Sequence, residues 1–249
     1  MPYQEMLSKK NIEDLKIRYP KQDDYESAIE KIEKGYPFQY LMGFVEFYGY
    51  YISVNESVLI PRFETELLVE KVVQYSLKYL NKPKILDIGT GSGCIPIALS
   101  HELRKLQLCE ISAIDISEDS IIVAKENFKK NKVSIDIQKM DILSEKPKQK
   151  YDIVISNPPY IANGEKVDIQ TKFEPQNALY AKNNGLEFYE RILSLNLLNE
   201  KGIIAFEIGQ SQGNSIKEIA KKFYPEAKII VEKDYTKKDR FVFIFQNCE

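Results

Sequence analysis

The sequence predicts an α/β protein with a mostly parallel seven-stranded sheet, an antiparallel C-terminal strand pair, and a β-hairpin and short helical segment before the sheet. Two observations favour this fold class. From residue 84 onward, short apolar strands alternate with segments whose apolar residues recur at helical spacing, which is typical of a parallel sheet covered on both faces. The last two strands follow each other too closely for a crossover helix, so that pair must be antiparallel.

The N-terminal quarter of the chain lies outside this alternation. Residues 1–36 are highly charged, with weak helical periodicity that Pro20 divides into two pieces. Residues 38–60 form an aromatic, β-branched run interrupted by glycines, which indicates a β-hairpin or small meander. Pro61 ends this run. We expect three parts: a helical segment at 1–36, a hairpin connector at 37–61 and a ligand-binding catalytic domain at 62–249.

The catalytic part is expected to begin with a helix and then to add the strands of the sheet in order. Helical spacing covers 65–80 and, after the first strand, 95–106. Ser117 is a suitable cap for the next helix, whose first turn carries Glu118 and Asp119 at the positive end of the helix dipole. The seven expected strands lie at 84–89, 111–115, 133–137, 151–156, 202–208, 228–235 and 240–247.

Composition argues against several classes of function. With 35 basic and 37 acidic residues, the chain lacks the basic excess that phosphate-neutralising proteins usually show. Its three cysteines have no CxxC spacing, so we expect neither a disulfide framework nor a metal site. The single histidine, His101, is expected on the solvated side of a helix, which leaves no histidine for a Ser-His-Asp or HExxH site. No signal peptide or membrane-spanning run is present, so we expect a cytoplasmic protein.

A glycine-rich turn, Asp87-Ile88-Gly89-Thr90-Gly91-Ser92-Gly93, follows the first strand of the sheet. Glycines there let the backbone turn tightly and come close to a ligand. Cys94 replaces the last glycine of the dinucleotide fingerprint, which disfavours a nicotinamide oxidoreductase. An acid before the first glycine suits a cationic ligand such as S-adenosylmethionine, whose sulfonium and ammonium groups Asp87 would attract. A glycine turn that binds nothing is the alternative.

Two later strand ends extend this predicted cofactor site. Asp115 ends the second strand, where a carboxylate accepts hydrogen bonds from ribose hydroxyls. Asp141 and Ile142 follow the third strand, where an adenine would lie, although Asp141 is as well explained as a strand-end cap. The predicted cofactor-binding residues are Asp87, Gly89, Thr90, Gly91, Ser92, Gly93, Asp115, Asp141, Ile142 and Asn157.

The tetrapeptide Asn157-Pro158-Pro159-Tyr160 follows an apolar strand and therefore lies at the same edge of the sheet. An amide nitrogen is a poor nucleophile because its lone pair is delocalised. The Asn157 Oδ1 atom and the Pro158 carbonyl can accept its two N–H bonds, and Tyr160 can pack against its flat face. Such a site works by positioning and electrostatics. A rigid proline turn without catalytic function is the alternative.

Several segments together resemble the release-factor glutamine N5-methyltransferase family (HemK/PrmC type), from about Tyr36 to the C-terminus. DIGTGSG with NPPY is similar to class I methyltransferases with a Rossmann-like fold that act on exocyclic or amide nitrogens. The segments that narrow the resemblance are YPFQYLMGFVEFYGY (36–50), LIPRFETELLVE (59–70), NPPYI (157–161), EP (174–175), NGLEFYERI (184–192), FEIGQSQG (206–213) and DYTKKDRF (234–241).

The resemblance implies methylation of the glutamine in the Gly-Gly-Gln tip of class 1 peptide release factors, with S-adenosylmethionine as donor. It implies that Asn157 contacts both cofactor and glutamine, and that Asn157, Pro158 and Tyr160 are catalytic. With Pro159 these residues would form the slot for the amide. Arg62, Glu64, Thr65 and Glu66 would support the methionine end of the cofactor, with an ordinary surface charge cluster as the alternative.

Two features of the sequence depart from the family pattern. The family usually has a larger helical N-terminal domain, and the position after Asp141, often aromatic in relatives, is Ile142.

An adenine-N6 methyltransferase acting on nucleic acid would use the same NPPY slot but would need a basic groove. A non-catalytic adapter that keeps the fold is the second rival. We expect no membrane and no direct nucleic-acid partner.

Overall fold

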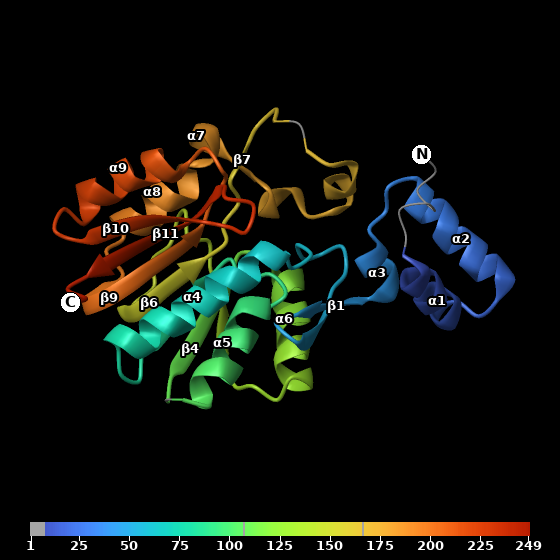
Figure 1. Cartoon of the computed structure of the whole chain (residues 1–249), viewed down its shortest axis with the longest axis horizontal. Coiled ribbons are helices and arrows are strands. Elements are labelled where there is room, and N and C mark those ends of the chain that lie inside the picture. Colours follow the sequence, from blue (N-terminus) through green and yellow to red (C-terminus); the bar gives the residue numbers. More distant parts are fainter. Residues whose placement is uncertain (1–7, 107, 166) are drawn as a thin grey trace.

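The computed structural model describes residues 8–106, 108–165 and 167–249, and its centre is a seven-stranded sheet (Figure 1). Every neighbouring pair is parallel except the two pairs that involve β11, which is antiparallel to both β9 and β10. The predicted fold class is therefore confirmed. In spatial order the strands are β10 (Lys228–Lys233), β11 (Asp239–Gln246), β9 (Leu198–Glu207), β6 (Tyr151–Ser156), β3 (Lys84–Ile88), β4 (Glu110–Asp115) and β5 (Asp136–Lys139).

Helices cover both faces of the sheet and bury alternate side chains of each strand. One apolar cluster holds Ile85 and Ile153 and packs against α4 (Phe63–Tyr79), α5 (Cys94–Arg104) and α6 (Glu118–Lys130). The next residues along the same two strands, Leu86 and Val154, belong to a second cluster. That cluster packs against α8 (Glu187–Ser194) and α9 (Gly213–Phe223) on the other face. This two-sided burial explains why the central strands are apolar throughout.

The N-terminal helices form a small cluster of their own, away from the sheet (Figure 1). Helices α1 (Lys9–Arg18) and α2 (Gln22–Glu33) pack with α3 (Phe38–Met42) around Leu15 and Ile32. The two predicted helical pieces are present, and residues 1–7 of that segment lie outside the described residues.

The predicted hairpin is present but begins later than expected. Its strands are β1 (Phe44–Phe47) and β2 (Tyr50–Ser53), and the expectation that extended structure starts at Phe38 is wrong. Residues Phe38–Met42 are helical because Tyr40 and Leu41 are buried in different apolar clusters, and tertiary packing overrides their strand propensity. Gly43 ends this helix in the left-handed conformation, with φ of 79°.

Smaller differences concern the third strand, the fifth strand and the histidine. The third strand is Asp136–Lys139 rather than 133–137, and the fifth is longer than expected, Leu198–Glu207. His101 is only partly exposed, because its ring stacks on Tyr50 with centroids 4.4 Å apart. The predicted surface position of His101 is therefore only partly solvated.

Between β6 and α8 the chain makes an excursion over the carboxyl ends of the strands. It contains a short parallel pair, β7 (Ile161–Ala162) and β8 (Tyr180–Ala181), which the sequence did not suggest. The same excursion contains two 3-10 helices, η2 (Ile169–Phe173) and η3 (Gln176–Ala178), and the irregular α7 (Lys182–Gly185). Within the described ranges, none of the helices has the length and apolar character required to cross a bilayer.

Candidate active site

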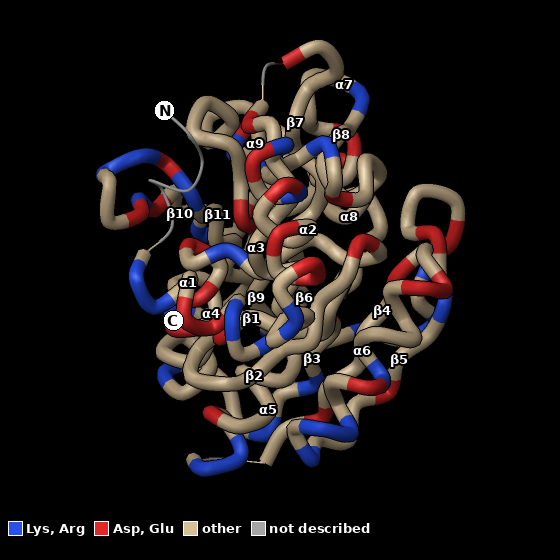
Figure 2. The backbone as a smooth tube through the Cα atoms, turned by 90° about the vertical axis from the view of Figure 1, so that its right-hand side faces the viewer, with Lys and Arg blue, Asp and Glu red and all other residues tan. Residues whose placement is uncertain are grey.

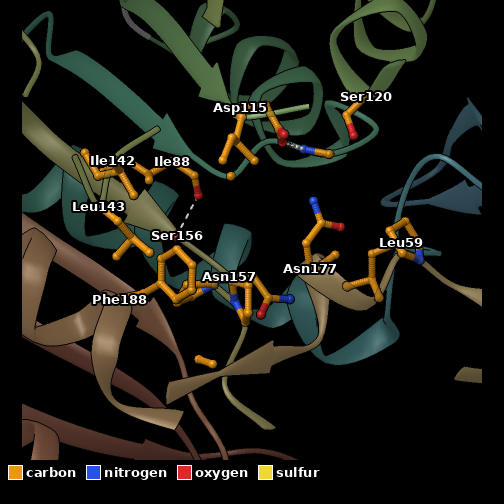
Figure 3. Close-up of a pocket in the computed structure, with 18 of the residues that line it drawn as sticks. Leu59, Ile88, Asp115, Ser120, Ile142, Leu143, Ser156, Asn157, Asn177 and Phe188 are labelled. Atoms are coloured by element: carbon orange, nitrogen blue, oxygen red, sulfur yellow. Dashed lines mark hydrogen bonds between the residues drawn. The ribbon is translucent and has the colours of Figure 1, made fainter. Parts of the chain in front are cut away.

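The carboxyl ends of β3, β4 and β6 meet at one edge of the sheet. Ile88, the last residue of β3, pairs with Ile114 on one side and with Ser156 on the other. The Ser156 hydroxyl donates to the Ile88 carbonyl at 2.7 Å, which joins two strand ends directly. Because the glycine turn follows Ile88 and Asn157 follows Ser156, both segments lie side by side (Figure 3).

The glycine turn is held by β4 and opens towards solvent-accessible space. The amides of Gly89 and Thr90 both donate to the Ile114 carbonyl, at 2.9 and 3.1 Å. Gly89 and Gly91 have φ of 72° and 54°, and a Cβ atom added to either would meet nothing within 4 Å. Gly93 has a different function, since its Cβ would lie 2.5 Å from Phe128. The first two glycines thus leave room for a ligand, and the third lets α5 pack closely on α6.

A cavity of about 420 Å³ lies over this edge, within the size range of small-molecule sites (Figure 3). Its walls include Gly89, Gly91 and Asp115 from the first two strand ends and Asn157 from β6. The other predicted site residues on its walls are Asp141, Ile142, Pro158 and Pro159. Asp87, Thr90, Ser92, Gly93 and Tyr160 are not on its walls.

Asp87 lies on β3, two residues before the first glycine of the turn, and is fully buried. Neither of its carboxyl oxygens has a hydrogen-bond partner, and the same holds for the hydroxyls of Thr90 and Ser92. Burial raises the pKa of Asp87 to about 7; the nearby Thr90 hydroxyl opposes this rise, and Asp115 adds to it. An unpartnered carboxyl beneath the glycine turn favours a ligand that carries positive charge.

Asp115 lines the cavity and is held in place by the backbone. Its two carboxyl oxygens accept from the amides of Gly91 and Ser117, at 2.8 and 2.9 Å. Burial raises the pKa of Asp115, and these amide contacts oppose the rise. Each oxygen retains acceptor capacity, so the carboxylate is suited to bind hydroxyl groups of a ligand in the cavity.

Asp141 and Ile142 have separate functions in the structure. The Asp141 carboxylate accepts from the Leu143 amide at 3.0 Å and from the Ser144 hydroxyl at 2.8 Å, so it caps the turn after β5. Ile142 is buried and, with Ile88 and Ile114, belongs to the apolar cluster beside the cavity. These three aliphatic side chains offer a flat apolar wall to a planar ring.

The Asn157-Pro158-Pro159-Tyr160 segment lines both the large cavity and a smaller one of about 230 Å³. Asn157 lines both cavities, whereas Tyr160 lines only the smaller one. Gln212 braces this segment, since its side-chain amide donates to the Tyr160 carbonyl at 2.9 Å. Burial raises the pKa of Tyr160 to about 12, so its phenol stays neutral and can serve only as a packing or hydrogen-bonding surface.

Four residues at the start of α4 were expected to support the cofactor, and none of them lines the large cavity: Arg62, Glu64, Thr65 and Glu66. Arg62 lines the smaller cavity and pairs with Glu174, while Glu66 accepts from the Tyr48 amide at 3.0 Å. Thr65 is buried beneath Asn157, whose side-chain amide donates to the Thr65 hydroxyl at 3.2 Å. Their expected contact with the methionine end of a cofactor stays a prediction.

The sequence analysis did not predict the residues of the large cavity that come from outside the strand ends. Leu59, from the connector, and Asn177 and Phe188, from the excursion after β6 and from α8, line the large cavity (Figure 3). Two of these, Leu59 and Phe188, lie in segments that carry the family resemblance, and that was the only signal available for them. No cluster of three or more His, Cys, Asp or Glu side chains suited to a metal ion occurs in the described part of the chain.

Comparison with known proteins identifies the family of this chain. Residues 63–186 match a family model described as the methyltransferase small domain. The chain is 39% identical to the release factor glutamine methyltransferase of Bacillus cereus over 236 residues, covering 91% of this chain and 82% of the relative. It is 36% identical to the enzyme of the same name from Streptococcus pneumoniae, covering 88% and 78% of the two chains.

A solved methyltransferase from Pyrococcus furiosus shares the fold, with a TM-score of 0.56, 19% identity, and coverage of 80% of this chain and 89% of that one. The fold and the site define a class I methyltransferase. Identity to the curated relatives over nine-tenths of the chain specifies the group within that class. The chain belongs to the release factor glutamine methyltransferase family.

Proposed function

We propose that this protein transfers the methyl group of S-adenosylmethionine to the side-chain amide nitrogen of the glutamine in the Gly-Gly-Gln motif of class 1 peptide release factors. The observation that carries the proposal is that Asn157 lines both cavities. A donor in the large cavity and a glutamine in the smaller one would meet at this residue. The names of the curated relatives support the choice of acceptor.

The size, charge and apolar lining of the large cavity support this choice of donor. Asp115 would bind the ribose hydroxyls, and Ile88 and Ile142 would contact the adenine. Asp87, unpartnered below the glycine turn, would favour the positive charge of the donor. Residues 62–249 would thus form the cofactor-binding catalytic domain, with the hairpin connector supplying Leu59 to its wall.

The acceptor side works by positioning. The Asn157 Oδ1 atom and the Pro158 carbonyl would accept the two N–H bonds of the glutamine amide and orient its nitrogen towards the large cavity. Tyr160 would pack against the amide plane. S-adenosylmethionine supplies an electrophilic methyl group whose S–C bond breaks as the N–C bond forms, and the leaving group is a neutral thioether. The extra proton on the product nitrogen passes to water, so no strong base is required.

The test uses a purified class 1 release factor, this protein and a donor with a deuterated methyl group. Mass spectrometry of the peptide that contains Gly-Gly-Gln should show one labelled methyl group on the glutamine. A release factor with Asn in place of that glutamine is the matched control and should remain unlabelled. Absence of label on the wild-type release factor, or label on an adenine of added DNA, would reject the proposal in favour of another acceptor.

The distribution of charge agrees with a protein acceptor. Lys and Arg residues are interspersed with Asp and Glu residues along the backbone, as Figure 2 shows for one side of the molecule. The balanced totals, 35 basic and 37 acidic residues, do not favour strong attraction to a phosphate backbone.

A further inference from the structure

A buried carboxylate, that of Glu207, lies at the strand end next to Asn157. Glu207 is the last residue of β9, and Asn157 follows the last residue of β6, its parallel neighbour. The register pairs Ser156 with Phe206, so the two following residues occupy equivalent places at adjacent strand ends. Glu207 is 1% exposed and is not on the walls of either cavity.

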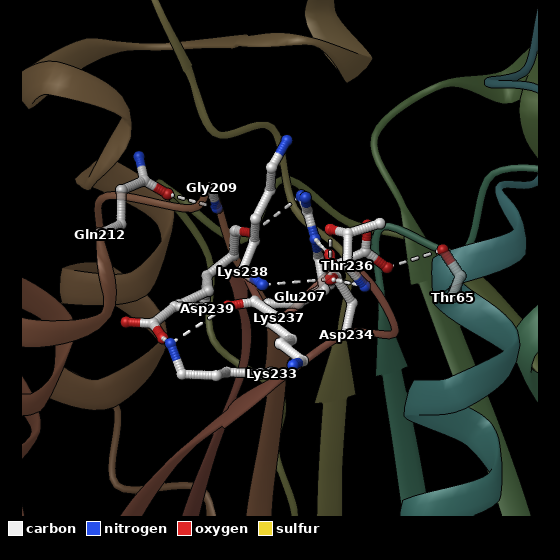
Figure 4. A network of polar contacts seen from close by, with 12 residues as sticks. Thr65, Glu207, Gly209, Gln212, Lys233, Asp234, Thr236, Lys237, Lys238 and Asp239 are labelled. Atoms are coloured by element: carbon white, nitrogen blue, oxygen red, sulfur yellow. Dashed lines mark hydrogen bonds and ion pairs between the residues drawn. The ribbon is translucent and has the colours of Figure 1, made fainter.

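Thr65, in the first turn of α4, connects the two side chains. Its hydroxyl donates to Glu207 Oε2 at 2.7 Å (Figure 4) and accepts from Asn157 Nδ2 at 3.2 Å. Thr65 is 2% exposed, so bulk water does not compete for these bonds. The three residues are more than 40 positions apart in sequence, and the network therefore exists only in the folded site.

The direction of these hydrogen bonds follows from the chemistry of the groups. An ionised carboxylate can only accept, so the Thr65 hydroxyl must donate to Glu207. The hydroxyl has then used its only proton and can only accept from Asn157, which must present its NH₂ group. The Oδ1 atom of Asn157 is consequently the end of the amide that remains available to an acceptor substrate.

We infer that Glu207 is a positioning residue that acts through Thr65 to fix which end of the Asn157 amide faces the acceptor. This inference rests on the proposed function of Asn157 as hydrogen-bond acceptor for a substrate N–H. If the amide were reversed, its NH₂ group would meet the N–H bonds of the glutamine and repel them. The ionised Glu207 carboxylate can only accept from Thr65, and this excludes the reversed orientation of the Asn157 amide.

The electrostatic surroundings of Glu207 agree with this function. Burial raises the pKa of Glu207 to about 7, while the Thr65 hydrogen bond and the positive charge of Arg240 oppose the rise. Glu64 raises the pKa further, and Arg62 lowers it. The raised pKa has a consequence: as the pH falls through about 7, Glu207 gains a proton, can donate to Thr65, and no longer fixes the direction of the relay.

Two substitutions remove the fixed direction of the Asn157–Thr65–Glu207 hydrogen bonds and keep the side-chain volume nearly unchanged. Thr65→Val deletes the hydroxyl, and Glu207→Gln adds a donor where only acceptors stood. Thr65→Ser keeps the hydroxyl and is the matched control. At saturating donor and release factor, we expect Thr65→Val and Glu207→Gln to lower kcat about 100-fold, as misplacement of a catalytic group does, and Thr65→Ser to lower it less than about fivefold. Calorimetry should show that the Kd of the donor changes by less than about threefold in Glu207→Gln, since Glu207 does not line the donor cavity.

A second measurement does not depend on the acceptor. In protein labelled with ¹⁵N-asparagine, the side-chain NH₂ resonance of Asn157 should titrate with a midpoint near pH 7 in the wild type and not in Glu207→Gln. Full kcat in both Thr65→Val and Glu207→Gln, equal loss in Thr65→Ser, or an Asn157 resonance that titrates alike in Glu207→Gln and wild type would each overturn the inference. Failure of the wild type to methylate a release factor would instead reject the proposed function, and the resonance titration would still decide whether Glu207 controls Asn157.

Discussion

Replacing Asp87 by Asn should make the protein without donor more stable at alkaline pH, an unusual result for a substitution beneath a binding site. Asp87 is fully buried with no hydrogen-bond partner, and burial raises its pKa from 3.8 to about 7. A tenfold change in an acid dissociation constant corresponds to about 1.4 kcal/mol. Ionised Asp87 therefore lowers the free energy of unfolding by about 4 kcal/mol above pH 7.

The sign and the pH window follow from the raised folded-state pKa. The penalty is absent below the pKa of the unfolded chain, grows as the pH rises between the two pKa values, and is complete above the folded-state value. Asn carries no charge, and its unpartnered amide costs about as much as the unpartnered neutral carboxyl that it replaces, so the substitution removes only the penalty of ionisation. We therefore expect Asp87→Asn to raise the free energy of unfolding by about 4 kcal/mol at pH 8 and by about 2 kcal/mol at pH 5.5.

Urea unfolding at the two pH values, without donor, measures this difference. Asp136→Asn, at an exposed position on β5, is the matched control and should change the free energy of unfolding by less than about 0.5 kcal/mol at either pH. The reasoning is refuted if Asp87→Asn is less stable than the wild type at pH 8, or if its effect is the same at both pH values.

Three further substitutions test the site. Asn157→Ala should lower kcat about 100-fold or more and keep much of the donor affinity, because the main function of this residue is to orient the acceptor; unchanged kcat in steady-state assays contradicts the mechanism. Asp115→Ala should weaken donor binding in calorimetry by about tenfold or more and leave much of kcat at saturation. Gly185→Ala should raise the KM for the release factor, because its Cβ would lie 2.0 Å from the Tyr160 carbonyl oxygen. Gly49→Ala, with a similar φ of 78° and no atom within 4 Å of the added Cβ, separates this clash from backbone strain.

The sheet and the main turns of the site were predictable because their signals are local. A run such as residues 84–89 combines apolar side chains with a following glycine turn, and polar residues such as Asp115 and Asn157 mark the ends of other apolar strands. In an open parallel sheet, strand ends share one edge, so the proximity of the glycine turn and Asn157 follows from topology alone. The antiparallel end of the sheet was likewise fixed by the short distance along the chain between its last two strands.

The parts that were missed depend on contacts between distant residues. Thr65 and Glu207 are 142 positions apart, and no periodicity or spacing links them. Phe38–Met42 looks like a strand in sequence and becomes a helix because Tyr40 and Leu41 pack in different clusters. The excursion between β6 and α8 is held by single contacts such as that of Glu174 with the Ile60 amide, which a local reading cannot detect.

The reversed direction of β11 has a consequence for the composition of the active edge. Every other strand of the sheet ends at the edge that carries the cavity, whereas β11 begins there. Arg240 therefore arrives next to the end of β9, where it binds Asp234 and the Ile208 carbonyl and lends positive charge to Glu207. If β11 were parallel to β9, its C-terminal residues would lie at this edge of the sheet. Arg240 would then lie at the opposite edge.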